Sequence, residues 1–473
     1  MKVRELSVGL GLAITLALTG CGAVPATDEA NQESVGQTQQ FITWSPAQHL
    51  VDEHVSWHTA PCTVAGQPLS GQAGVGRRCS NTGEDFLIWH RAFLQRLRDE
   101  FEAQGRVDDI TPWYTVPPEI RSAPGWNTTL EANVQAMSTF INPQTGVRFA
   151  SLNEYGQFIE GNFHGNLHTI SSSLWSVTDP DVGGFTSPRS TLFFKIHGYI
   201  DYLFQQFLAG DFNWDGNSDV IARRADTGAT RVLYMHDRSL VSTDTITTTQ
   251  SASDGCNWYV GATADLNFDG HLDLVWHGPG CGQAEVWLMS DTTTLLSKVA
   301  LPGKASTWTL IGAADYNHDN RPDLFWRHDT TQNLNVWLMN GTNVVSVPSV
   351  IVPTGGWRPV LVGDITPDGQ PNLFYRKLSS GSVSYGVTDV TGGALSSLTL
   401  TRALTSLDPT LPLPKAIGRY HLGGATADLL FEIDPNSEFQ LASLTSVTNG
   451  SPSYTPAPTT TPISTHDDIE GPR

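Results

Sequence analysis

The chain has 473 residues, too many for a single hydrophobic core, so we expect two or more domains. Its formal net charge of −20 argues against a nucleic-acid-binding protein, because such a protein needs a basic surface. Much of the acidity falls in Asp-rich loops of the second half, which gives the charge a local explanation.

Residues 1–20 have the pattern of a secretory signal: two basic residues precede an apolar run that is shorter than a membrane span. The closing motif LTGC resembles a bacterial lipobox, which implies cleavage before Cys21 and lipid attachment to its thiol. Gly22 stands where an Asp would retain such a protein at the inner membrane. We therefore expect an exported, lipid-anchored protein of the outer membrane or cell surface; the alternative is an ordinary cleaved signal peptide.

Residues 21–40 are small and polar, have little to bury, and predict a flexible tether. Export makes disulfides permissible for the four cysteines beyond Cys21. Sequence proximity favours the pairs Cys62–Cys79 and Cys256–Cys281, although four cysteines allow three pairings.

Helical spacing begins in the segment WSPAQHLVDEHVSWH, where Ser45 or Pro46 is a plausible helix start. The segment contains His49, His54 and His58, and the last two are four residues apart. Residues i and i+4 lie on one face of a helix, so two imidazoles at this spacing can bind one metal ion.

A second helix is expected over residues 85–102, with one apolar face and His90 on it. Further along, His164 and His168 are again four residues apart, and His197 lies among apolar and aromatic residues. Imidazole suits zinc, copper, iron or nickel, so this pattern predicts a metal site without naming the metal.

The stretch FLIWHRAFL around His90 resembles the first copper-binding signature of tyrosinases, catechol oxidases and related type-3 copper proteins. Their second signature is similar to the stretch that contains Glu160, His164, His168, Ser187, Pro188, Phe193, Phe194, His197 and Asp201. The resemblance implies that residues 41–208 form a mainly α-helical bundle that holds two copper ions.

Carried over position by position, the resemblance assigns one copper ion to His164, His168 and His197, and the other to His58 and His90. The family's middle ligand falls at Asn81, which cannot serve in the same way. Three possibilities follow: His54 supplies the third imidazole, His49 does so, or the site is incomplete. We favour His54, because it repeats the four-residue spacing of the other site.

The activity implied is oxidation of an o-diphenol to an o-quinone by dioxygen at the copper pair, with a small phenolic substrate. Gly165 stands where an Asn accompanies monophenol hydroxylation in the family, so we expect diphenol oxidation to dominate. Glu160 is a candidate for orienting water or a ligand histidine; a helix-surface carboxylate is the alternative. An apolar surround of Trp89, Phe163, Leu167, Phe193 and Phe194 is expected to limit water around the metals.

Two other functions are compatible with these motifs: a surface binding or adhesion protein with a vestigial copper domain, and an oxygen carrier. The copper hypothesis makes a geometric prediction. His58 and His90 must lie within about a helix diameter, ~10 Å, of the other three histidines.

The second half, residues 209–450, repeats a different motif, D-x-N-x-D-G-x-x-D, about every 50 residues. These units resemble FG-GAP (VCBS-type) repeats and predict an all-β propeller of five to seven blades, with an unknown ligand on its surface. Alternating oxygen ligands in a tight loop are typical of calcium sites. The predicted calcium ligands are Asp211, Asn213, Asp215 and Asp219; Asp265, Asn267, Asp269 and Asp273; and Asp315, Asn317, Asp319 and Asp323.

A fourth unit keeps Asp364 and Asp368 but replaces other ligand types with Thr366 and Asn372, so it should bind calcium weakly if at all. A fifth unit, near Arg419, has lost the motif. Residues 451–473 are rich in Thr and Pro and predict a disordered tail.

Overall fold

The computed structural model describes residues 43–63, 77–224, 226–236, 239–350, 355–363, 371–379, 382–389, 402–404, 414–419, 428–434, 438–448, 451–458 and 467–471. The predicted signal, its Cys21 and the tether lie outside these residues, as do Asp364, Thr366 and Asp368. Of the helices in the described ranges, none is both long and apolar enough to cross a membrane.

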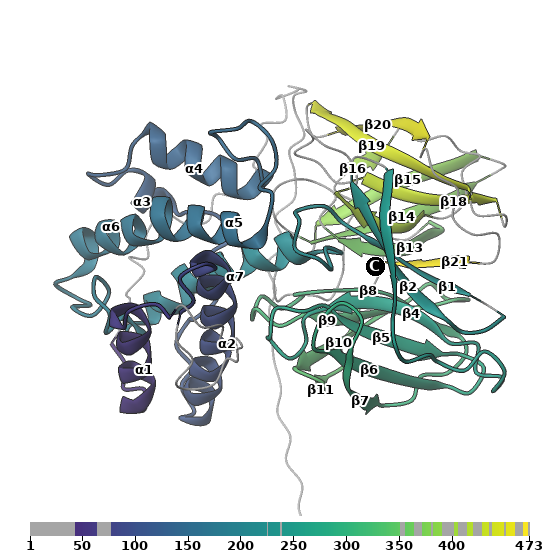
Figure 1. Ribbon diagram of the computed structural model, residues 1–473, viewed down its shortest axis with the longest axis horizontal. Helices are drawn as coiled ribbons and strands as arrows, with labels where there is room; N and C mark the ends of the chain where they lie inside the picture. The colour runs from purple at the N-terminus through teal and green to yellow at the C-terminus, as the bar shows by residue number, and fades with distance from the viewer. Residues whose placement is uncertain are drawn as a thin grey trace, which may run out of the picture. The chain divides into compact units, whose positions relative to one another are not determined.

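The first part of the described chain is helical, as predicted (Figure 1). Its elements are α1 (Gln48–Thr59), α2 (Thr82–Ala103), α3 (Pro118–Arg121), α4 (Thr128–Thr139), α5 (Leu152–Ile159), the π-helix η1 (Glu160–His164), α6 (Gly165–Trp175), the 3₁₀ turn η2 (Ser187–Arg189) and α7 (Thr191–Leu208). Side chains of Asn127, Ser151 and Ser190 cap the N-termini of α4, α5 and α7 by accepting backbone N–H groups. Helix α1 begins two residues later than the predicted Pro46 start and has no side-chain cap.

Helix α2 packs against both α5 and α7 and is buried along most of its length. At the crossing with α5 the two backbones touch through Gly83 and Gly156. A Cβ atom on Gly83 would lie 2.1 Å from the backbone N of Gln157 and 2.2 Å from the backbone O of Asn153. This close approach brings the first turn of α2 against the helix that leads into His164.

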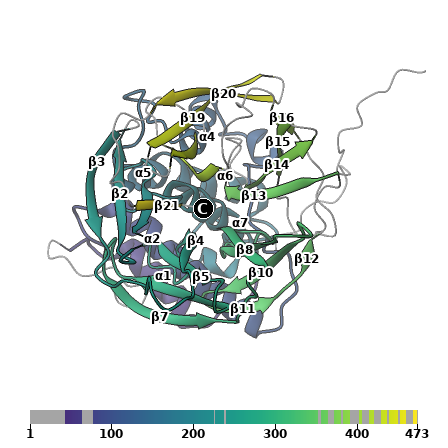
Figure 2. The same ribbon diagram turned by 90° about the vertical axis from the view of Figure 1, so that its right-hand side faces the viewer.

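The second part is β-rich and consists of five antiparallel sheets among the described residues (Figures 1 and 2). The first three sheets contain β1 (Val220–Arg224), β2 (Thr230–His236), β3 (Ser239–Thr245) and β21 (Asp467–Gly471); β4 (Tyr259–Ala264), β5 (Asp273–Gly278), β6 (Gln283–Met289) and β7 (Leu295–Leu301); and β8 (Trp308–Ala314), β9 (Asp323–His328), β10 (Leu334–Asn340), β11 (Asn343–Ser346) and β12 (Ser349–Val350). The other two contain β13 (Trp357–Gly363), β14 (Asn372–Ser379), β15 (Ser382–Asp389) and β16 (Arg402–Leu404); and β17 (Pro414–Gly418), β18 (Asp428–Asp434), β19 (Glu438–Thr448) and β20 (Ser451–Pro458).

One strand from each sheet lies against a strand of the next, in the cyclic order β21, β4, β8, β13, β17 and back to β21. Figure 2 shows four of these strands, β21, β4, β8 and β13, around the point marked C. Each Asp-rich loop enters its sheet directly before the second strand of a unit, because Asp219, Asp273 and Asp323 stand at or next to the first residues of β1, β5 and β9.

Residues 451–473, for which the sequence predicts a disordered tail, contain two strands in their described part. Strand β20 pairs with β19, and β21 pairs with β1, so the end of the chain completes the first sheet. Strand β20 carries several prolines and is the outer strand of its sheet, which is where prolines in strands are mostly found.

Both predicted disulfides, Cys62–Cys79 and Cys256–Cys281, are confirmed. The first links the end of the α1 segment to the residues just before α2 and so ties the two histidine-bearing helices together. The main hydrophobic core runs without interruption from the helices into the first two sheets, where Ile221, Leu274 and Trp276 join it.

Candidate metal centre

The first histidine cluster is formed by α1 and α2. His54 and His58 lie one turn apart on α1, and His90 faces them from the middle of α2. Their ligand nitrogens all lie within 4.8 Å of one another. His54 and His90 are buried, and His58 is partly exposed. Of the three possibilities for the first site, the structure is compatible with His54, which lies in the cluster with His58 and His90.

The second cluster combines three elements: His164 ends the π-helix η1, His168 lies on α6, and His197 lies on α7. Their ligand nitrogens also lie within 4.8 Å of one another. The π-helix interrupts an otherwise continuous α-helix, and such interruptions are frequent at functional sites because they re-aim side chains. Sequence spacing predicted the pair but carried no signal for this change of helix type.

The two clusters face each other. The imidazole centroids of His90 and His197 are 5.1 Å apart with nearly parallel rings, and those of His58 and His164 are 6.0 Å apart. His54 and His197 are 6.1 Å apart by the same measure. The requirement that the clusters lie within ~10 Å is therefore met.

Four of the six imidazoles are oriented by backbone carbonyls. The Nδ1 of His54 donates to the carbonyl of Phe185 (2.7 Å), that of His90 to Phe86 (2.8 Å), and that of His168 to Val182 (2.8 Å). His197 donates in the same way to Phe193 (3.2 Å). A proton held on Nδ1 leaves the Nε2 lone pair for a metal, which is the usual arrangement around metal-binding histidines.

All six imidazoles are kept neutral, chiefly by burial. Desolvation lowers the pKa of His54, His90, His164, His168 and His197, and it lowers that of His58 to about 3 with help from His168 and Arg77. Neutral imidazole is the form that binds metals. Within the described residues the buried Nε2 of His54 has no hydrogen-bond partner. A lone pair of this kind is costly unless a metal or proton donor meets it, so the donor set fits a pair of metal ions.

Two of the predicted apolar residues contact the clusters directly: Trp89 lies against His90, with ring centroids 4.8 Å apart, and Phe193 lies against His197. The other three, Phe163, Leu167 and Phe194, are buried. The ring of Phe193 lies 3.8 Å from that of His197, centroid to centroid, and nearly parallel to it.

One aromatic residue that sequence analysis missed borders the centre on its solvent side. Phe185 stacks on His58 with centroids 5.0 Å apart, and 51% of its surface is exposed. It lies in the loop before η2, where no periodicity marks a residue as functional. The loop nevertheless contributes the carbonyls that orient His54 and His168.

Three other predicted residues lie apart from the clusters. His49 is on α1 but exposed. Asn81 immediately precedes α2 and donates from its side-chain amide to Glu84. Glu160 begins η1 and forms an ion pair with Arg77 at 2.7 Å; burial raises its pKa, and Arg77 opposes that rise. A role for Glu160 in orienting water stays a prediction.

The Asp-rich loops share one hydrogen-bond pattern. In the first loop the carboxylate of Asp211 accepts the backbone N–H groups of Asp215 and Gly216, at 3.1 and 2.7 Å. Asp265 and Asp315 do the same in the second and third loops. The Asn side chains, Asn213, Asn267 and Asn317, donate to the second carboxylate of each motif, Asp215, Asp269 and Asp319.

The last Asp of each motif is turned toward its own sheet. Asp219 accepts backbone N–H groups from Phe212 and Met235, and Asp273 and Asp323 accept from the equivalent residues. Through these hydrogen bonds the last Asp stabilises the loop and the sheet without a bound ion. Among the described residues, the groups of His, Cys, Asp and Glu close enough to hold a metal are the two histidine clusters. Calcium binding by the loops stays a prediction.

The charges around the first Asp of the motif, and hence its pKa, differ among the three loops. Burial, followed by the neighbouring Asp215 or Asp319, raises the pKa of Asp211 to about 7 and that of Asp315 to about 8. Burial also raises the pKa of Asp265, but Arg91 opposes that rise. Asp211 and Asp315 therefore lie in crowded negative charge that a cation would relieve, whereas Asp265 already forms an ion pair with Arg91.

Part of the chain matches a known family. Residues 265–326 and 315–375 match the family model of the FG-GAP-like repeat, which confirms the predicted repeats over this stretch. Comparison with curated protein sequences finds no significant match. The resemblance of the helical part to type-3 copper proteins rests on its motifs.

Proposed function

We propose that the helical part is a di-copper oxidase that converts o-diphenols to o-quinones with dioxygen. The observation that carries the proposal is the pair of facing imidazole triads, with centroids 5.1 Å apart at the closest pair between them. His54, His58 and His90 would hold one copper ion, and His164, His168 and His197 the other. Bound copper ions would supply reversible electron transfer and a place for dioxygen to bind.

The residues of the chain prepare the centre in three ways. The carbonyl contacts of His54, His90, His168 and His197 hold a proton on Nδ1 and leave Nε2 for a metal. Burial keeps the imidazoles unprotonated at neutral pH. The aromatic surround excludes water that would otherwise compete for open coordination positions.

Substrate access is supported on the side of His58. This histidine is partly exposed, and the exposed ring of Phe185 stacks on it. A phenolic ring can pack against Phe185 in the offset or edge-on manner that aromatic pairs prefer. A solvent-bordered entry favours an enzyme over an oxygen carrier, which needs room only for dioxygen.

Diphenols are the favoured substrates because Gly165, directly after His164, offers no side chain to hold a water or accept a phenolic proton. The expected result is quinone formation from catechol or L-DOPA and little turnover of tyrosine. Comparable rates with tyrosine would contradict this assignment.

The decisive experiment is metal analysis followed by an oxidase assay. Purified protein loaded with copper should hold two copper ions per chain and oxidise catechol, with quinone measured by absorbance. Two bound ions without turnover would favour oxygen carriage. One ion or none would favour the alternative of a surface binding protein with a vestigial centre.

For the β part we propose a five-bladed propeller. Five antiparallel sheets, cyclic contact between their inner strands, and closure of the first sheet by β21 support it. We further propose calcium in the first and third Asp-rich loops, a surface ligand for the propeller, and attachment to the membrane through lipid on Cys21. Mass spectrometry of the mature N-terminus tests the lipid directly: an unmodified terminus would exclude the anchor.

A further inference from the structure

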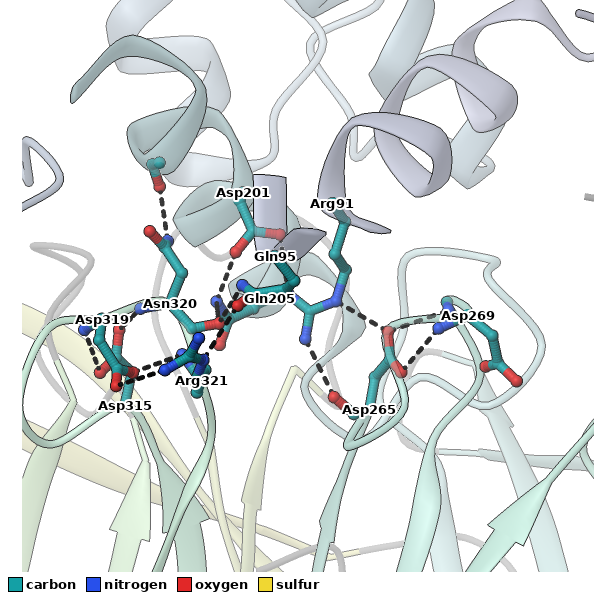
Figure 3. A network of polar contacts seen from close by, with 12 residues as sticks. Arg91, Gln95, Asp201, Gln205, Asp265, Asp269, Asp315, Asp319, Asn320 and Arg321 are labelled. Carbon is teal, nitrogen blue, oxygen red and sulfur yellow. Dashed lines mark hydrogen bonds and ion pairs between the residues drawn. The ribbon is translucent and has the colours of Figure 1, made fainter. Parts of the chain in front are cut away.

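The residue after the metal ligand His90 reaches from the helices into the β part (Figure 3). Arg91 donates through Nη1 to the carboxylate of Asp201 and through Nε to that of Asp265, each at 2.8 Å. Its Nη2 donates to the backbone carbonyl of Asp265 at 3.0 Å. At most 2% of any of these three side chains is exposed.

These contacts join the ligands of both clusters to one Asp-rich loop. Asp201 lies one turn after His197 on α7, so Arg91 connects the helices that carry His90 and His197. Asp265 is the first residue of the second loop, and the same loop packs against α2 again at Gly270. A Cβ atom on Gly270 would lie 2.8 Å from Ile88, two residues before His90.

The third loop contacts the same helices through Asn320 (Figure 3). Its side-chain amide donates to the carbonyl of Gly198, the residue after His197, at 2.9 Å. A Cβ atom on Gly198 would lie 2.8 Å from Oδ1 of Asn320, so the glycine permits the approach. Gln95 of α2 and Gln205 of α7 both donate to the backbone carbonyl of Asn320, at 3.3 Å.

Asn320 departs from the repeat motif in a way that these contacts explain. The equivalent positions in the first two loops are Gly216 and Gly270, both with positive φ. Asn320 keeps that conformation, at φ 64°, because Asn tolerates the left-handed region better than other side chains. What it adds over glycine is the amide that reaches α7.

We propose that Asp265 and Asn320 are positioning residues of the metal centre, so that the second and third repeat loops hold α2 and α7 at the separation both clusters require. The inference rests on the proposed function only in taking the histidines as metal ligands. The loops act through Arg91 and Gly198, which adjoin His90 and His197. Removal of such supporting contacts typically weakens metal binding by about 10- to 100-fold.

The test measures Co²⁺ binding to the full chain, freed of transition metals and kept in excess calcium, by competition with a chromophoric chelator. Co²⁺ also reports ligand geometry through its visible bands, recorded at full loading. The variants are Asp265→Asn, which keeps the shape but removes the ion pair, and Asn320→Gly, which restores the repeat motif. The control is Asp99→Asn: Asp99 pairs with Arg321 across the same contact region, but its side chain is 56% exposed.

We expect Asp265→Asn to weaken Co²⁺ binding about 10-fold and to alter the visible bands, while Asp99→Asn stays within about twofold of wild type. Binding and bands of Asp265→Asn equal to those of Asp99→Asn would overturn the proposal. Circular dichroism checks that each variant is folded; if Asp265→Asn is not, Asn320→Gly decides by the same criteria. Absence of Co²⁺ binding in the wild type would instead refute the proposed metal centre.

Discussion

At the scale of single residues, the proposed metal centre depends on which histidine completes the first cluster. The structure places His54 in that cluster and leaves His49 exposed. They are five positions apart, which turns the two side chains about 140° from each other around a helix. Only the face that carries His54 and His58 is turned toward α2.

His54→Ala is therefore expected to reduce bound copper from two ions per chain to one and to abolish catechol oxidation. His49→Ala is the matched control from the same helix and should retain both ions and full activity. Elemental analysis of the purified proteins gives the comparison. Equal loss in the two variants would mean that His54 is not a ligand.

Acid should destabilise the metal-free protein through the same imidazoles. A histidine whose pKa is lowered on folding binds fewer protons in the folded than in the unfolded state, so its stabilising contribution is complete above pH ~6.5 and declines as pH falls. For His58 the decline continues to about pH 3. Chelator-treated wild type should therefore lose free energy of unfolding more steeply than His58→Gln, by about 1.4 kcal/mol per pH unit within this window. Denaturant titrations at several pH values measure both slopes, and parallel slopes would contradict the assignment.

At the scale of secondary-structure elements, the position of the histidine clusters depends on a helix crossing where only glycine fits, because the two backbones touch. The contact of α2 with α5 at Gly83 and Gly156 sets the direction in which α5 delivers η1 and His164. The π-helix then turns His164 inward, while α6 continues with His168 on the same side.

Gly83→Ala should destabilise the protein by about 3 kcal/mol, because the added Cβ meets backbone atoms that no rotamer change can move. Gly161→Ala, in η1, is the control: its Cβ would meet nothing within 4 Å, and alanine favours helix. Chemical denaturation compares the two. A Gly83→Ala protein as stable as Gly161→Ala would show that the helices can separate at little cost.

The loops of the repeats provide a second prediction at this scale. Calcium should raise the melting temperature of the wild type, and Asp315→Asn should reduce that gain. Because the pKa of Asp315 is raised to about 8, protons compete for its carboxylate as pH falls through that value, and the calcium effect should weaken. Asp364→Asn, in the fourth unit, should behave as the wild type. Thermal unfolding with calcium and with chelator tests this prediction. If calcium has no effect on the melting temperature of the wild type, the proposal of calcium sites in these loops is wrong.

At the scale of the whole molecule, the two parts share one core, and the end of the chain closes the first sheet. Strand β21 pairs with β1 and also contacts β4 and β17. The histidine-bearing helices in turn rest on loops of the second and third repeats. Changes that destabilise the β part are thus expected to affect the histidine clusters as well.

Removal of residues 467–473 should lower the cooperativity of unfolding and promote association, because it exposes the edge of β1 for pairing with another chain. Removal of residues 472–473 alone leaves β21 in place and should have little effect. Light scattering during thermal unfolding distinguishes the two truncations. A monomeric, equally stable longer truncation would show that β21 is dispensable.

Local spacing in the sequence was enough to predict much of this protein. The pairs His54/His58 and His164/His168 follow from helical period, the Asp-rich loops from a repeated motif, and the disulfides from proximity along the chain. These features depend on residues a few positions apart, or on a pattern that recurs, and both are visible without a fold.

Tertiary structure alone decided which of those residues meet. It chose His54 for the first cluster, placed Phe185 over His58, and paired Arg91 with Asp265, 174 residues further along the chain. It also made strands of a tail whose composition predicted disorder. Such outcomes depend on which helix face or sheet edge finds a partner, and that free energy comes from packing between distant segments rather than from local preference.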